Sequence, residues 1–102
     1  MLRLTEQEAA MDRTIFEAEL QAEGYRETAL REMPANQANP EHDHPFDARL
    51  LILGGEMTIA CGGEERTYRA GDTFTMAAGR RHAERAGPAG VQYLAGRRHP
   101  AA

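Results

Sequence analysis

Three histidines carry the chemistry that this sequence suggests. His42 and His44 form a His-x-His pair, and His82 lies much further along the chain. In an extended segment alternate side chains point to the same face, so the two rings of the pair would lie side by side. Their Cα atoms would be roughly 6.5 to 7 Å apart, close enough for both imidazoles to bind one cation. We therefore expect a metal site, provided that the fold brings His82 to the pair.

The elements that would position these histidines are short β-strands. Ten glycines, five prolines and brief apolar runs favour strands and turns over a helical bundle. Strands are expected over residues 25–33, 48–53, 56–61, 66–70, 73–76, 82–85 and 91–95. Hairpin or turn signals separate them at residues 54–55, 62–64, 71–72, 77–81 and 87–90. Short strands with frequent turns are typical of an all-β sandwich or barrel.

The first part of the chain, residues 1–24, is expected to be an acidic helix packed on the outside of the barrel. A capping box at residues 5–8 would begin this helix, and Gly24 is suited to its end. Its narrow apolar stripe consists of Ile15, Phe16 and Leu20. The stripe would pack on the barrel, and the acidic face would remain in water.

The composition limits the classes of function. The 102 residues are enough for one domain, with the barrel at residues 25–96 and a short tail at 97–102. The formal net charge of −4 argues against binding to nucleic acid. Cys61 is the sole cysteine, so an intrachain disulfide is impossible. No segment resembles a leader or a membrane span, and we expect a cytoplasmic protein.

The segment around the histidine pair resembles the first motif of the cupin family. This motif reads glycine, five residues, His-x-His, three or four residues, glutamate, six residues and glycine. The positions that match it are His42, His44 and Gly55. Asn36 replaces the first glycine, a mild change because asparagine also tolerates positive φ. Ala48 stands where the glutamate is expected, so the usual carboxylate ligand is missing.

The segment around the third histidine resembles the second cupin motif. This motif reads glycine, five residues, Pro-x-Gly, two residues, histidine, three residues and asparagine. The positions that match it are Gly71, Gly79 and His82. Ala77 replaces the proline and Ala86 the asparagine. Because both motifs occur in the right order, the chain resembles a small single-domain bacterial cupin over residues 25–96.

The resemblance implies an all-β fold, the double-stranded β-helix or cupin jelly-roll barrel, here preceded by one N-terminal α-helix. It also implies a mononuclear divalent metal, Zn, Fe, Mn or Ni, held in the barrel by His42, His44 and His82. Asp47 would replace the missing carboxylate ligand if the chain bends there, although one step along a regular strand faces the opposite side. Otherwise water would complete the coordination.

Several other residues are candidates for the pocket. Glu84 shares the face of His82 by strand alternation, which suggests a partner of a ligand or a general base. The candidate wall residues are Phe46, Arg49, Met57, Phe74, Met76 and Tyr93. Core packing explains the apolar ones equally well. Arg49 interrupts an apolar run and would form a salt bridge at a dimer interface or hold an anionic substrate. The density of that run also favours a homodimer.

Two functions fit these residues. The first is a metal-dependent enzyme acting on a small organic molecule, such as a dioxygenase, an isomerase or a decarboxylase, with the metal as Lewis acid or oxygen site. The second is a binding or sensing barrel that holds a small ligand without chemistry and has lost its metal. The three histidines favour the first function, and the missing glutamate favours the second.

Overall fold

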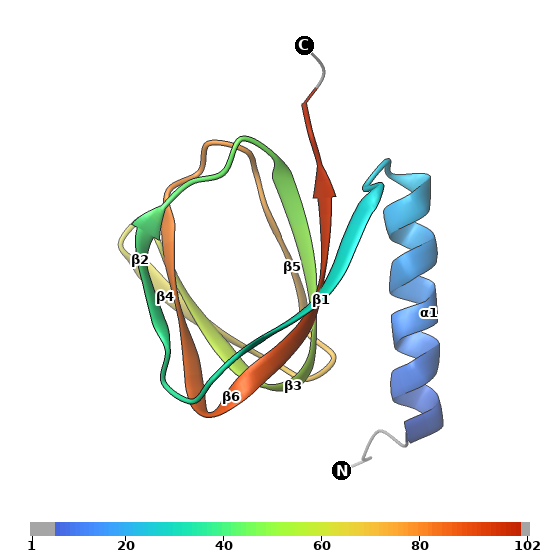
Figure 1. Cartoon of the computed structure of the whole chain (residues 1–102), viewed down its shortest axis with the longest axis horizontal. Helices are drawn as coiled ribbons and strands as arrows, with labels where there is room; N and C mark the ends of the chain where they lie inside the picture. The colour runs from blue at the N-terminus through green and yellow to red at the C-terminus, as the bar shows by residue number, and fades with distance from the viewer. Residues whose placement is uncertain (1–5, 101–102) are drawn as a thin grey trace.

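The computed structural model describes residues 6–100 and consists of one helix followed by six strands. The helix α1 spans Glu6–Ala22. The strands are β1 (Glu27–Met33), β2 (Ala38–His42), β3 (Asp47–Cys61), β4 (Glu64–Arg69), β5 (Thr73–Met76) and β6 (His82–Arg98). The strands roll into a barrel and α1 lies outside it, next to β1 (Figure 1). The expectation of an all-β barrel preceded by one helix is confirmed.

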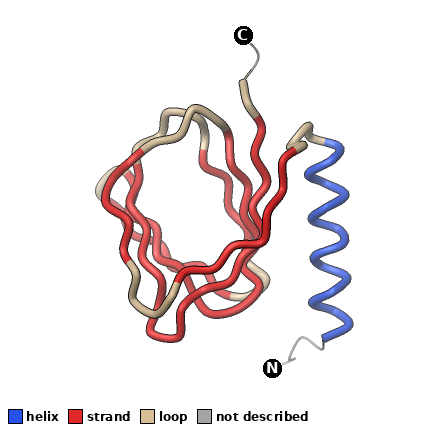
Figure 2. The backbone as a smooth tube through the Cα atoms, in the orientation of Figure 1, coloured by secondary structure: helices blue, strands red, loops and turns tan. Residues whose placement is uncertain are grey.

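Two long strands form the centre of the sheet. β3 and β6 pair with each other along most of their lengths, and all pairs in the sheet are antiparallel. The first half of β6 also pairs with β2 and its second half with β1. In the same way, β3 pairs first with β5 and then with β4. Strands therefore form most of the barrel wall (Figure 2).

The expected turn at Gly54-Gly55 is wrong, because β3 runs through it. The register between β3 and β6 shifts on either side of these glycines, between Ile52 and Gly54 and between Gly55 and Met57. Gly55 has a φ of +72°, and a Cβ built on it would lie 2.0 Å from the carbonyl oxygen of Gly90. The paired glycines thus make β-bulges that bend the strand, a feature with the same sequence signal as a hairpin turn.

The expected break at residues 87–90 is wrong for the same reason, since β6 is continuous from His82 to Arg98. This strand also extends two residues beyond position 96, where we expected the barrel to end. The hairpin expected at Gly62-Gly63 is present, with φ values of +62° and +82°. Positive φ at both central residues is the signature of a type I′ turn.

The helix packs on the outer face of the barrel through one apolar cluster. Its members are Phe16, Leu20, Tyr25, Leu51 and Leu94. Leu20 is fully buried, whereas Ile15 is 55% exposed, so the prediction that Ile15 belongs to the buried stripe is wrong. The capping box predicted at residues 5–8 depends on a threonine that lies outside the described residues. Across residues 6–100, no helix has the length and apolar character needed to cross a bilayer.

The end of α1 forms a Schellman motif. Gly24, with a φ of +82°, donates its N–H to the carbonyl of Gln21, and Tyr25 donates to the carbonyl of Leu20. The glycine therefore stops the helix as expected, two residues after Ala22, the last residue of α1.

The apolar run in β3 is covered within the chain itself. Leu50 and Ile52 belong to the inner core of the barrel, and Leu51 contacts the cluster under α1. The helix thus covers the face that suggested a dimer interface, and the homodimer stays a prediction.

The role of Gly55 gives a test of this fold. We expect Gly55→Ala to lower the free energy of unfolding by about 2 kcal/mol more than Gly63→Ala, because its methyl group meets backbone that cannot move aside. Gly63 is a matched control, since it also has positive φ but no atom lies within 4 Å of its built Cβ. Urea unfolding of both variants measures the difference. Equal losses would contradict the close approach of β3 and β6.

Candidate metal centre

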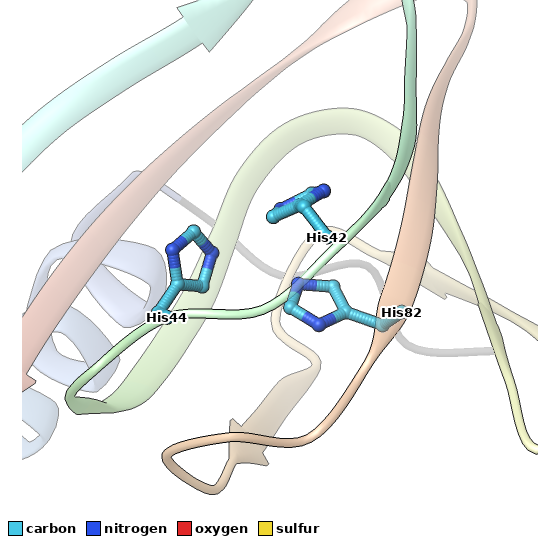
Figure 3. Close-up of side chains that lie close together, drawn as sticks. All are labelled: His42, His44 and His82. Atoms are coloured by element: carbon cyan, nitrogen blue, oxygen red, sulfur yellow. The ribbon is translucent and has the colours of Figure 1, made fainter.

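The structure brings the three histidines together at one end of the barrel wall (Figure 3). His42 ends β2, His44 lies in the loop between β2 and β3, and His82 begins β6. The nearest ring pairs have centroids 4.5 Å apart (His42 and His82) and 4.7 Å apart (His42 and His44). One ligand nitrogen from each ring can be chosen so that all three lie within 4.8 Å of one another.

Two backbone features hold the histidines in this arrangement. His42 and His82 are register partners in the antiparallel pair of β2 and β6, so their side chains leave the sheet next to each other. His44 is tied to the same place because its carbonyl accepts a hydrogen bond of 2.8 Å from the N–H of Gly79. Its ring stacks on Phe46 with centroids 4.8 Å apart.

Hydrogen bonds determine which nitrogens can bind a metal. Nδ1 of His42 lies 2.7 Å from the carbonyl oxygen of Pro40, and Nδ1 of His82 lies 2.9 Å from that of Arg80. A carbonyl oxygen only accepts, so we assign the ring protons to Nδ1. The Nε2 atoms of both rings then carry the free lone pairs that metal coordination needs.

The surroundings of His44 favour its neutral form, because they lower its pKa. Burial lowers the pKa of this ring, and the neighbouring His42 and His82 lower it further. A neutral imidazole is the form that binds a metal. Because the lowered pKa delays protonation as the pH falls, His44 keeps its lone pair to a lower pH than an exposed histidine would.

Of the carboxylates in the described part of the chain, that of Glu84 lies nearest to the free nitrogens of His42 and His82. Its Oε1 lies 3.8 Å from Nε2 of His42, and its Oε2 lies 3.9 Å from Nε2 of His82. The side-chain amide of Asn39 donates a hydrogen bond of 2.8 Å to Oε1 and orients the group. The position lies on the same side of β6 as His82, where strand alternation placed it.

Asp47 has different partners. Its Oδ1 accepts a hydrogen bond of 2.8 Å from the N–H of Ala78, and its Oδ2 lies 2.9 Å from Nη2 of Arg98. The hydrogen bond from Ala78, followed by that from Arg98, lowers the pKa of this carboxyl group. Ala48, the next residue, lines the cavity instead. The structure therefore does not bring Asp47 to the histidines, in keeping with the alternation of side chains along β3.

A cavity of about 440 Å³ adjoins the histidines. Of the candidate wall residues, those that line it are Phe46, Phe74, Met76 and Tyr93. Met57 does not line the cavity, because its side chain is fully buried in the inner core.

Arg49 does not line the cavity either, because it faces the helix on the outer side of β3. Its guanidinium lies 3.3 Å from Glu19 and 3.1 Å from Glu23, and it covers the ring of Phe16. Arg49 thus forms salt bridges within its own chain, to Glu19 of α1 and to Glu23 just after it, and the salt bridge at a dimer interface stays a prediction.

Sequence reasoning missed three polar residues of the cavity wall. Arg31, Asn39 and Arg97 all line it. Continuing the alternation of Tyr93 along β6 would have found Arg97, had this strand been extended past position 96. No signal in the sequence pointed to Asn39, since its role depends on the pairing of β2 with β6.

Together these features define a small antiparallel barrel with a histidine cluster beside an internal cavity. The sequence profile of the cupin domain family, Cupin_2, matches residues 29–91 of this chain. The chain therefore belongs to the cupin family. Among curated proteins none matches it.

Solved structures support the jelly-roll form of the barrel. A cupin superfamily protein from Desulfitobacterium hafniense is 22% identical with a TM-score of 0.65, covering 72% of this chain and 66% of that chain. A conserved protein of unknown function from Streptococcus pyogenes is 26% identical with a TM-score of 0.61, covering 74% and 77%. The Cnp3 cupin domain from Schizosaccharomyces pombe is 16% identical with a TM-score of 0.66, covering 72% and 55%.

This chain spans less than two thirds of the length of several such structures, 65% of a cupin-2 domain containing protein from Shewanella frigidimarina for example. The likeness shows the fold, and the activity must be argued from the site.

Proposed function

We propose that this cupin binds one divalent metal ion through His42, His44 and His82 and acts on a small organic molecule in the adjoining cavity. The observation that carries the proposal is the convergence of three ligand nitrogens within 4.8 Å of one another. Two of the rings have their Nδ1 atoms occupied by backbone carbonyls, which leaves Nε2 free. Orientation of ligand histidines by hydrogen bonds at the other nitrogen is the usual arrangement in metal sites.

The donor set fits such an ion. Three neutral imidazoles suit Zn, Fe and Ni, and a nearby carboxylate also suits Mn. Three protein ligands leave positions for a substrate or water. When bound, the ion would supply a Lewis acid or an oxygen site.

The chain's own residues supply the rest of the chemistry. Glu84 lies beside the free nitrogens of His42 and His82, so it is placed to exchange a proton with a substrate there or to complete the coordination. Asn39 fixes one of its oxygens. Part of the cavity wall is apolar, and the volume of about 440 Å³ lies in the range of small-molecule sites.

The second candidate function is a binding or sensing barrel without chemistry. The observation that favours it is Ala48, which lines the cavity at the position of the family's carboxylate ligand. Under this alternative a ligand would fill the cavity of the metal-free protein.

Metal analysis tests the proposal. We expect about one equivalent of a divalent metal per chain after loading with Zn, Fe, Mn or Ni in turn, and loss of most of it in His82→Ala, because three ligands become two. His99→Ala is the control, since this histidine binds Glu27 and lies outside the cluster. Elemental analysis of dialysed protein provides the measurement. A wild type that retains none of the four metals would refute the proposal, and tight binding of a small ligand by that protein would favour the second function.

A pair of carboxylate variants tests which acid serves the site. We expect Glu84→Gln to weaken zinc binding about tenfold or more, because a carboxylate beside the ligand nitrogens is replaced by a neutral amide. Asp47→Asn is the control and should leave zinc affinity unchanged while lowering stability, since its partners are Ala78 and Arg98. Competition with a chromophoric chelator measures both affinities. A larger loss in Asp47→Asn would show that Asp47 is the carboxylate of the site.

A further inference from the structure

Two arginines give the cavity a positively charged side. Arg31 of β1 and Arg97 of β6 line it together with the histidines. Within the described part of the chain, neither guanidinium forms a salt bridge. By contrast, Arg49 and Arg98, which face outward on the same sheet, are paired with carboxylates.

The sheet register places these two charges on the inner face. Arg31 and Tyr93 are partners in the pair of β1 and β6, so both side chains leave the sheet on the cavity side. Arg97 lies two alternations further along β6 and shares that face.

Arg97 is held in place without being neutralised. Its guanidinium lies 4.5 Å above the ring of Phe46, and that ring stacks on His44 at 4.8 Å. A contact with an aromatic face positions the guanidinium and leaves its N–H donors free. The guanidinium of Arg97 therefore lies close to the histidine cluster, with only the ring of Phe46 between it and the ring of His44. One small molecule can reach both groups.

The acids near the cavity have other partners. Among the described residues that line the cavity, Glu84 is the single acid, and it accepts a hydrogen bond from Asn39 beside the histidines. Glu27 is the register partner of Arg97, but its carboxylate lies 3.3 Å from His99.

The charges of Arg31 and Arg97 act on Tyr93, a residue of the cavity wall. Burial, followed by the charge of Glu84, raises the pKa of Tyr93, and the two arginines act in the opposite direction.

We propose that the cavity binds a small organic carboxylate, with its anionic group at Arg31 and Arg97 and its apolar body against Phe46, Phe74 and Met76. The guanidinium fork matches the two oxygens of a carboxylate, and the apolar wall favours an organic acid over inorganic phosphate. This inference names the substrate class of the proposed metal site and to that extent rests on the proposed function. The prediction that the cavity binds a carboxylate depends on the two arginines and not on the metal.

The test compares acids with their neutral amides. Benzoate, hexanoate, benzamide and hexanamide are titrated into metal-stripped protein and into zinc-loaded protein, with binding measured by calorimetry. We expect the acids to bind the wild type at least tenfold more tightly than the amides. Arg97→Gln and Arg31→Gln should each remove most of that preference while leaving amide binding unchanged. Arg85→Gln is the control, since it removes the same charge from an exposed position of β6 outside the cavity lining.

The outcomes separate this inference from the proposed function. Retention of the acid preference in His82→Ala and in metal-stripped protein supports the arginine site whether or not the metal proposal survives. Equal binding of acids and amides, binding of neither by folded protein, or an unchanged preference in both arginine variants overturns it. Inorganic phosphate is titrated in the same way, and tighter binding of phosphate than of both acids also overturns the inference. If Arg97→Gln fails to fold, Arg31→Gln decides, because Arg31 is exposed and forms no salt bridge with any described residue.

Discussion

The pairing of β2 with the first residues of β6 is the constraint on which the site depends. It makes His42 and His82 register partners, although a large part of the chain separates them. The same pairing sets Asn39 opposite Glu84, so the carboxylate and the amide that orients it arrive together. A slip of one residue in this register would turn His42 of β2 away from the face that carries His82 and Glu84 of β6.

The long strands β3 and β6 make that pairing possible. Each changes partners midway, and each bends where glycines allow the backbones to approach closely. Gly55 and Gly90 meet at one such point, where no larger residue fits beside the facing carbonyl. The bends curl one antiparallel sheet into a barrel, which brings the histidine-bearing end over the apolar wall formed by β3 and β5.

The sequence predicted the barrel and the histidine cluster because both depend on motifs with local signals. It could not distinguish a bulge from a turn at Gly54-Gly55, since both features use glycine at positive φ. Because the glycine pair was predicted to be a turn, β3 was predicted as two short strands, and its full length in the sheet was missed. The positions of Arg49 and Arg97 were missed for related reasons. One depends on where the helix docks, and the other on how far β6 continues.

Nδ1 of His42 and Nδ1 of His82 each bond to the backbone carbonyl two residues earlier, so both rings are oriented before any metal ion binds. Each ring is held by the backbone two residues before it, so its rotational freedom is lost during folding and not when a metal ion binds. Selectivity among metal ions would then depend on the fixed spacing of the histidine nitrogens and not on side chains that rearrange around each ion.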